Sequence, residues 1–148
     1  MIPISVVIFT KNEENNISQC IKSVLNFSQI VVVDSNSSDS TRRIAETFKI
    51  DFYNFTWNGN YPKKRQWSLD KISYKNNWVL FLDADERMTT DLSEELREFM
   101  RESQSYYSGG SFTIDYYFAG KRLRFGQKLS KLVLLRLNDA KFPIVDDL

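Results

Sequence analysis

The chain has 148 residues, a formal net charge of +1, 42% hydrophobic residues and 26% charged residues, the composition of one soluble globular domain. This near-neutral charge gives no support to a nucleic-acid partner. The sequence contains no histidine, which excludes histidine-based catalytic triads and histidine metal sites, and its single cysteine, Cys20, excludes an internal disulfide.

Short apolar runs rich in β-branched residues predict strands over residues 4–10, 30–33, 51–55 and 78–82. Amphipathic helices are expected between them. The first helix carries one apolar face, made of Ile17, Cys20, Ile21, Val24 and Leu25. Cys20 is therefore expected to be a core residue rather than a nucleophile. The alternation of strands and helices predicts a three-layer, Rossmann-like α/β fold with a mostly parallel sheet.

The later elements carry weaker signals. Pro62 suits the first turn of the third helix, and Asp91 with Glu94 suits a capping box at the start of the fourth. From Phe112 to Phe118 apolar residues alternate with others, which predicts a half-exposed strand turned back by residues 119–121. Another strand is predicted over residues 131–137. The sheet is therefore expected to be mixed in its C-terminal part.

Two predicted strands end on acidic residues. Asp34 follows the second strand, and Asp83 and Asp85 follow the fourth. The carboxyl ends of parallel strands share one edge of a sheet, where ligands bind. Two carboxylates so spaced suit Mg²⁺ or Mn²⁺ when phosphates supply the remaining coordination. A solvated acidic turn is the alternative for this pair taken alone.

Basic residues at positions 63–65 are expected to reach the same edge and to hold phosphates. Both glycine-rich phosphate-loop motifs are missing from the sequence. A metal would therefore carry most of the charge of a diphosphate. Acids for a metal and basic groups for phosphates together indicate a nucleotide-diphosphate ligand.

Three segments together resemble family 2 glycosyltransferases: residues 10–14 (TKNEE), 32–41 (VVDSNSSDST) and 82–87 (LDADER). Residues 118–123 and 135–137 resemble the lipopolysaccharide-core branch of that family. The resemblance implies the GT-A fold and an inverting, metal-dependent enzyme. Such an enzyme moves a sugar from a nucleotide diphosphate, usually UDP, to a glycan or glycolipid such as lipopolysaccharide core.

The resemblance also implies a nucleotide-sugar site made of Thr10, Asn12, Glu14, Asp34, Arg65 and Asp83. Asp85 would bind Mn²⁺ or Mg²⁺ directly, with Asp83 facing the ribose or the same metal. The bound cation would neutralise the departing diphosphate. One domain is expected over residues 1–148. Residues 1–108 would bind the nucleotide sugar, and residues 109–148 would form strands on the acceptor side. The acceptor part is expected to be a truncated form of the one in the family.

An inverting reaction needs a base that deprotonates the acceptor hydroxyl. In the lipopolysaccharide-core branch this base is usually a glutamate after a histidine, and the matching place here reads Val145-Asp146-Asp147. Asp147 is the expected base, and the alternatives are Asp146 or no competent base within residues 1–148. Two other functions stay open: a truncated, non-catalytic nucleotide-sugar-binding fragment, and a haloacid-dehalogenase-type phosphatase, which also places Asp-x-Asp after a strand.

No apolar run approaches the roughly 18 residues of a membrane-spanning helix. The amino terminus lacks the basic segment and cleavage site of a signal peptide, so a cytoplasmic location is expected. Residues 116–137 interleave basic and aromatic side chains with no acid among them. This pattern suits peripheral contact with an anionic membrane face or a phosphorylated glycolipid, although a solvated segment explains it too.

Overall fold

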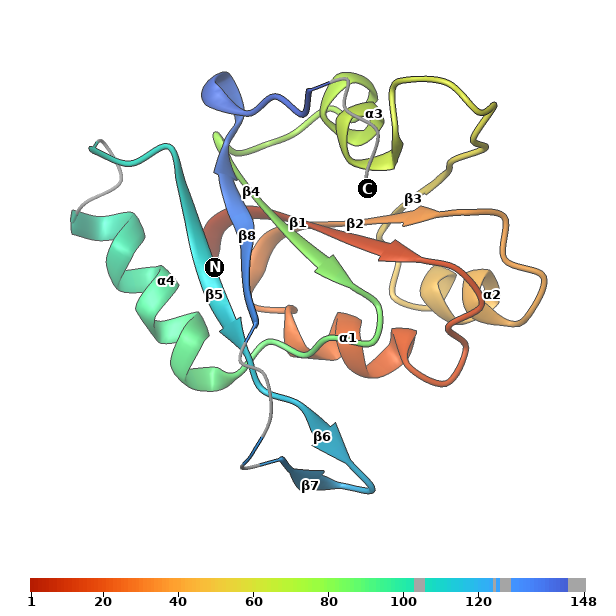
Figure 1. Ribbon diagram of the computed structural model, residues 1–148, viewed down its shortest axis with the longest axis horizontal. Helices are drawn as coiled ribbons and strands as arrows, with labels where there is room; N and C mark the ends of the chain where they lie inside the picture. The colour runs from red at the N-terminus through yellow and green to blue at the C-terminus, as the bar shows by residue number, and fades with distance from the viewer. Residues whose placement is uncertain (103–105, 124, 126–128, 144–148) are drawn as a thin grey trace.

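The computed structural model describes residues 1–102, 106–123, 125 and 129–143, and its centre is a mixed sheet (Figure 1). Four neighbouring strands run parallel, namely β1 (Ile2–Thr10), β2 (Phe27–Asp34), β3 (Asp51–Asn54) and β4 (Trp78–Asp83). β8 (Leu129–Arg136) pairs antiparallel with β4, and β5 (Gly109–Ile114) pairs antiparallel with β8. The strand order is β3-β2-β1-β4-β8-β5, which confirms a mostly parallel sheet with a mixed C-terminal part.

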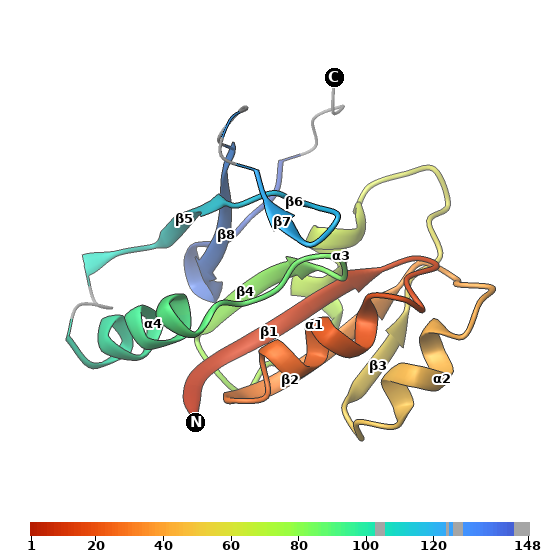
Figure 2. The ribbon, with the colours of Figure 1, turned by 90° about the horizontal axis from the view of Figure 1, so that it is seen from below.

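Helices cover both faces of this sheet. They are α1 (Ile17–Ser23), α2 (Thr41–Glu46), α3 (Lys64–Lys71) and α4 (Thr90–Glu102). α1 and α2 lie on one face with α4 on the same side, whereas α3 lies on the other, which gives the predicted three layers (Figures 1 and 2). A 3₁₀ turn over Leu137–Asp139 follows β8. Among the described helices, none is both long and apolar enough to cross a bilayer.

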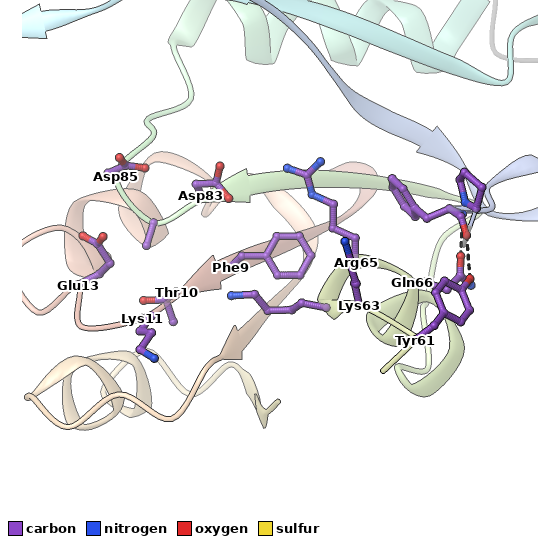
Figure 3. Close-up of a pocket in the computed structure, with 14 residues that line it drawn as sticks. Phe9, Thr10, Lys11, Glu13, Tyr61, Lys63, Arg65, Gln66, Asp83 and Asp85 are labelled. Carbon is purple, nitrogen blue, oxygen red and sulfur yellow. Dashed lines mark hydrogen bonds between the residues drawn. The ribbon is translucent and has the colours of Figure 1, made fainter. Parts of the chain in front are cut away.

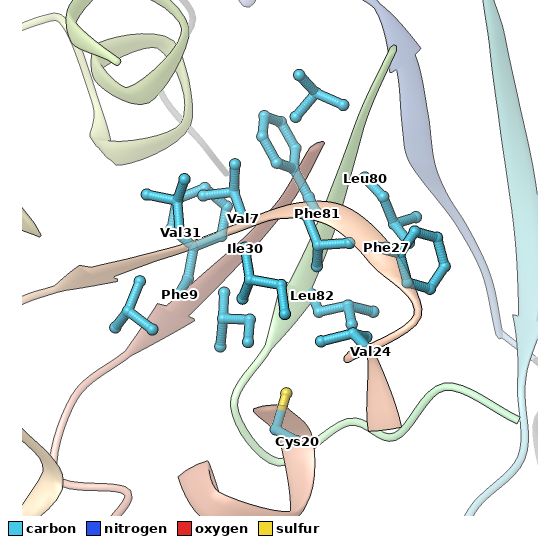
Figure 4. Close-up of a cluster of buried hydrophobic side chains, with 14 of the residues drawn as sticks. Val7, Phe9, Cys20, Val24, Phe27, Ile30, Val31, Leu80, Phe81 and Leu82 are labelled. Atoms are coloured by element: carbon cyan, nitrogen blue, oxygen red, sulfur yellow. The ribbon is translucent and has the colours of Figure 1, made fainter. Parts of the chain in front are cut away.

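The core lies along the three central strands. Val6, Val7 and Ile8 of β1 have no exposed surface, and Val31 to Val33 of β2 are equally buried. Phe81 and Leu82 of β4 pack beside them (Figure 4). Such unbroken apolar runs are stable only where helices cover both faces of a strand. The same burial fixes the strand ends, where the chain first meets solvent.

Two helix boundaries differ from prediction. α1 ends at Ser23, so Val24 still packs into the core but Leu25 is 53% exposed. The predicted apolar face is therefore one residue too long. α3 begins at Lys64, so Pro62 lies before the helix rather than in its first turn.

The predicted capping box at the start of α4 is wrong. The backbone amide of Leu92 donates a 3.2 Å hydrogen bond to the hydroxyl of Thr89, which therefore caps the helix. Asp91 lies inside the first turn, and Glu94 pairs with Arg97 instead of reaching back. Both Thr89 and Asp91 are cap-forming residue types. Capping by Thr89 leaves the Asp91 carboxylate near the positive end of the helix dipole.

The strand predicted from Phe112 to Phe118 is two strands. β5 ends at Ile114, and β6 (Tyr117–Phe118) pairs with β7 (Lys121–Arg122) in a separate hairpin. The predicted turn is confirmed, since Ala119 and Gly120 between these strands have φ angles of 48° and 74°. Tyr117 and Phe118 are 66% and 74% exposed, so this hairpin stands outside the core.

Candidate active site

A cleft of about 690 Å³ opens at the carboxyl ends of β1 and β4, beside the start of α3 (Figure 3). Its volume falls in the range of roughly 300–1,000 Å³ that is usual for small-molecule sites. Charged side chains of both signs line it: Lys11, Glu13, Lys63, Lys64, Arg65, Asp83 and Asp85. Opposite charges gathered in one cleft suit a ligand that carries phosphates together with a cation.

Strand register brings these groups together. Phe9 of β1 pairs with Asp83 of β4, and Thr10 pairs with Asp34 of β2. Beyond the strand end, the amide of Ala84 donates a 3.0 Å hydrogen bond to the carbonyl of Phe9. The three strand ends therefore lie side by side. This confirms the prediction that the carboxyl ends of these strands share one edge of the sheet.

Thr10 has a buried hydroxyl at the wall of the cleft. The residue is 2% exposed, and its hydroxyl has no hydrogen-bond partner within the described part of the chain. An unpaired buried hydroxyl is costly unless a ligand satisfies it. Thr10 is thus suited to bind a polar group that enters the cleft.

Asn12 and Glu14 tie the loop after β1 to the loop after β2. The amide of Ser38 donates a 2.8 Å hydrogen bond to the side-chain oxygen of Asn12, whose own amide donates to Ser37 Oγ at 2.7 Å. The amide of Ser40 donates to the Glu14 carboxylate at 2.9 Å. Both predicted nucleotide-binding residues therefore support the rim of the site rather than lining the cleft.

Asp34 also lies behind the cleft surface. Its carboxylate accepts a 2.7 Å hydrogen bond from the amide of Ser37 and a second from the hydroxyl of the same residue, and Asp34 is only 2% exposed. The carboxylate is thereby held in the turn after β2. Glu13, for which the sequence pattern predicted no role in the site, does line the cleft.

Lys64 and Arg65 bring positive charge from the first turn of α3. The ammonium of Lys64 lies 5.4 Å from the centre of the Phe9 ring. Burial lowers the pKa of Lys64, and the nearby carboxylates of Asp83 and Asp34 oppose this shift only in part. Arg65 extends towards the end of β4, as predicted (Figure 3). Both cations are placed to meet phosphate oxygens.

The acidic end of β4 is held by a lysine from β8. The ammonium of Lys131 lies 2.5 Å from Asp83 Oδ2 and 2.9 Å from Glu86 Oε1. The other oxygen of Glu86 accepts a 2.8 Å hydrogen bond from the amide of Asp83. Burial is the largest single effect and lowers the pKa of Lys131, but the two carboxylates together raise it above the usual 10.5.

Arg87 fixes the loop that carries Asp85. Its guanidinium donates hydrogen bonds to the carbonyls of Ala84 and Glu86 at 2.9 and 2.8 Å, and to Asn16 Oδ1 at 3.1 Å. Asp85 is left exposed at the tip of this loop, facing the cleft. Arg87 therefore positions the predicted metal ligand.

The donor set fits a divalent cation only in an open site. Asp83 and Asp85 offer hard carboxylate oxygens, the ligands that Mg²⁺ and Mn²⁺ prefer. Within the described ranges, however, no three acidic or sulfur side chains gather closely enough to hold a metal by themselves. Mg²⁺ is commonly held by one or two carboxylates with substrate phosphates and water completing its shell. The cleft fits a metal of that kind.

Two hydrogen bonds between side chains and the backbone of Phe142 hold the C-terminal segment at the far end of the cleft. The amide of Phe142 donates to Gln66 Oε1 at 2.8 Å, and the hydroxyl of Tyr61 donates to the carbonyl of Phe142 at 2.7 Å (Figure 3). Phe142 and the following proline line the cleft. The predicted base Asp147 and its alternative Asp146 lie outside the described residues.

Cys20 is a core residue, as predicted. It has no exposed surface, and burial raises the pKa of its thiol to about 12, so the thiolate is scarce at neutral pH.

Comparison with known proteins assigns the family. Residues 5–143 match the model of "Glycosyl transferase family 2". An uncharacterized glycosyltransferase of Rickettsia typhi, RT0209, is 33% identical over 94% of this chain and 47% of its own length. The lipopolysaccharide core biosynthesis glycosyltransferase LpsC of Rhizobium meliloti is 34% identical over 69% of this chain and 38% of its own length. The chain thus spans less than half of these two relatives.

The fold is similar to the crystal structure of TarS residues 1–349 from S. aureus. The TM-score is 0.57 with 26% sequence identity, over 68% of this chain and 33% of that one. TarS has also been crystallised with UDP and with UDP-GlcNAc. The match to residues 5–143 covers nearly the whole chain, and the sheet agrees with the GT-A fold, so the chain belongs to glycosyl transferase family 2.

Proposed function

We propose that the chain is the donor-binding part of an inverting, metal-dependent glycosyltransferase that uses a UDP-sugar. The observation that carries the proposal is the cleft in which Asp83 and Asp85 lie opposite Lys64 and Arg65, at the carboxyl ends of β1 and β4. The family match and the UDP complexes of TarS support the choice of donor.

The diphosphate of the donor meets the basic side of the cleft. The guanidinium of Arg65 pairs with phosphate oxygens through two parallel hydrogen bonds, and the partly buried Lys64 adds a point charge. The hydroxyl of Thr10, which lacks a protein partner among the described residues, donates to a polar atom of the nucleotide. Asn12, Glu14 and Asp34 stabilise the two loops at the rim of the cleft. These loops bind the nucleobase and the ribose of the donor.

Asp83 and Asp85 would hold Mn²⁺ or Mg²⁺, which when bound supplies Lewis-acid stabilisation of the leaving diphosphate. The residues of this chain do the rest of the positioning. Arg87 sets the loop of Asp85 through two carbonyl contacts. Lys64 and Arg65 stabilise negative charge as it develops on the diphosphate.

Inversion requires an acceptor hydroxyl on the opposite face of the sugar and a base beside it. We assign the base to Asp147, with Asp146 as the alternative. The hydrogen bond between the amide of Phe142 and Gln66 holds the chain against α3. Asp146 and Asp147 follow Phe142 by only a few residues in the sequence. We assign residues 1–108 to donor binding and residues 109–148 to a glycan or glycolipid acceptor such as lipopolysaccharide core, apart from Phe142 and Pro143, which line the donor cleft.

The exposed hairpin β6–β7 suits the acceptor side. It presents Tyr117 and Phe118 beside Lys121 and Arg122. Aromatic and basic side chains together suit the inner face of a membrane or a phosphorylated glycolipid. Peripheral membrane contact through this hairpin is therefore included in the proposal.

Calorimetric titration with UDP, with and without Mn²⁺, tests the donor site. UDP should bind in the presence of Mn²⁺, and Asp85→Asn should remove the metal dependence. The matched control is Asp51→Asn, an exposed aspartate at the start of the edge strand β3 and outside the cleft lining. Failure of UDP to bind at millimolar concentration contradicts the proposal, and a metal dependence that survives in Asp85→Asn contradicts the role of Asp85.

A non-catalytic nucleotide-sugar-binding fragment is the second candidate, favoured by one observation. The chain spans only 47% and 38% of two curated relatives, so more than half of each relative lies outside the matched region. UDP release from UDP-sugars, measured with acceptor lipids and with water alone, separates the candidates. UDP binding without any turnover supports the fragment, and turnover supports the enzyme.

A further inference from the structure

Lys131 forms ion pairs with two carboxylates at the acidic end of β4. Its ammonium bridges Asp83 and Glu86 at 2.5 and 2.9 Å, and the side chains of Lys131 and Glu86 are only 22% and 20% exposed. Two carboxylates around one cation at the end of β4 form a cation site that the protein fills with its own side chain.

The sheet delivers this cation by register. β8 pairs antiparallel with β4, with Trp78 opposite Arg136 and Leu80 opposite Leu134. The same register continued along both strands places Lys131 beside Asp83. The lysine belongs to a strand of the sheet, so its position does not depend on a flexible loop.

We propose that Lys131 is a tethered cation that competes with the divalent metal for Asp83 and thereby couples metal binding to nucleotide binding. Without a nucleotide, a metal must displace the ammonium from Asp83 while finding few other ligands, since no three acidic or sulfur side chains converge within the described residues. With a diphosphate in the cleft, the displaced ammonium gains new anionic partners and the metal gains phosphate oxygens.

The length of the lysine side chain permits this exchange. Four methylene groups carry a compact charge with freely rotating donors, so the ammonium can leave one oxygen and contact another without movement of β8. Glu86 holds the same ammonium from the other side and keeps it near the cleft during the exchange. Lys131 therefore acts as a positioning residue that discourages metal binding to the empty site.

The inference rests on the proposed function, because it concerns the same metal and nucleotide. It predicts a specific change in the coupling between them. Neutralising Lys131 should strengthen the binding of Mn²⁺ alone about fivefold or more, and should weaken the mutual enhancement of Mn²⁺ and UDP by a similar factor. Because such coupling is reciprocal, both ligands must show the same loss.

The experiment measures free Mn²⁺ by electron paramagnetic resonance, with and without UDP, in the wild type, Lys131→Met and Lys71→Met. Lys71→Met is the matched control, because Lys71 lies exposed in the last turn of α3. This substitution changes the net charge by the same amount as Lys131→Met. Neutral variants of Lys131 should bind Mn²⁺ alone more tightly than the wild type does, and Lys71→Met should not. Lys131→Gln serves as a second neutral variant, and thermal unfolding checks the fold of each.

Unchanged Mn²⁺ affinity in folded Lys131→Met or Lys131→Gln overturns the inference, even while UDP and Mn²⁺ bind the wild type and so support the proposed function. Weaker Mn²⁺ binding in these variants overturns it as well. If neither neutral variant folds, Lys131 has a structural role and the inference also fails. Absence of UDP binding to the wild type would instead count against the proposed function itself.

Discussion

The backbone amide of Phe142 donates a 2.8 Å hydrogen bond to the side-chain oxygen of Gln66, 76 residues earlier in the chain. Gln66 is 8% exposed, and Phe142 is partly buried. The contact holds the segment after the 3₁₀ turn against α3 and closes one end of the cleft.

Gln66→Leu should therefore lower the free energy of unfolding by about 1–3 kcal/mol, since it leaves a partly buried amide without its acceptor. Tyr61→Phe removes the hydroxyl that donates to the carbonyl of the same Phe142, and should cost only about 0.5–1.5 kcal/mol. Urea unfolding of both single variants and the double variant measures the two effects and their coupling. A larger loss in Tyr61→Phe than in Gln66→Leu would contradict this account of the segment.

Thr10→Val should separate stability from binding. The substitution replaces an unpaired buried hydroxyl with a methyl group of similar size, so the free energy of unfolding should stay the same or rise by about 1 kcal/mol. UDP affinity should fall roughly fivefold, the value of one hydrogen bond. Urea unfolding and calorimetry measure both quantities, and Thr113→Val, an exposed position on β5, is the control. Equal UDP affinity in wild type and Thr10→Val would show that the hydroxyl does not meet the ligand.

UDP affinity should fall at alkaline pH because of Lys64. Burial lowers the pKa of Lys64 below the usual 10.5, so its ammonium is lost earlier than that of an exposed lysine as the pH rises. Lys64→Arg keeps the charge and should move this fall in affinity to higher pH. UDP titrations at a series of pH values test the difference, and identical pH profiles for the two proteins would refute it.

The lowered pKa of Lys64 affects folding stability in the opposite direction from ligand affinity as the pH rises. Between the lowered pKa and 10.5, the unfolded chain binds more protons at Lys64 than the folded chain does. The contribution of Lys64 to the free energy of unfolding therefore increases with pH in that window, although it supports ligand binding less.

Asn12 should contribute to stability through both its backbone and its side chain. Its φ angle is 54°, which is unfavourable for most residues, and its side-chain oxygen accepts the hydrogen bond from Ser38. Asn12→Ala should cost about 1–3 kcal/mol, because it loses the contact and strains the backbone. Asn12→Gly loses only the contact and should cost less. Thermal unfolding ranks the variants, and a less stable glycine variant would contradict the role given to the backbone.

The sequence predicted the parts of this protein that depend on local pattern. β1, β2 and β4 are unbroken apolar runs buried on both faces, and such runs can be recognised without knowledge of their neighbours. The position of Asp83 and Asp85 follows from where the last of these runs stops. The strand, the family and the acidic end of the cleft could therefore be inferred together.

Features that depend on distant pairing could not be predicted. Lys131 meets Asp83 only because β8 inserts beside β4 in a particular register, and the basic run around Lys131 gave no sign of it. Glu14 faces a loop 26 residues away, where Ser40 uses its carboxylate. No local pattern encodes either contact. The sequence likewise offered no way to choose Lys64 over its basic neighbours, since the contact of its ammonium with the Phe9 ring is what distinguishes it.

The strand order also constrains how this chain is completed during synthesis. β4 carries the acidic residues of the cleft, yet its outer neighbour β8 lies about 50 positions later, with β5 and the hairpin made in between. Until residue 136 has left the ribosome, the apolar residues Val79 and Leu80 present an open strand edge. Open apolar edges associate with other chains. A nascent chain that stalls in this interval would be prone to aggregate, and chaperone capture of arrested chains should peak there.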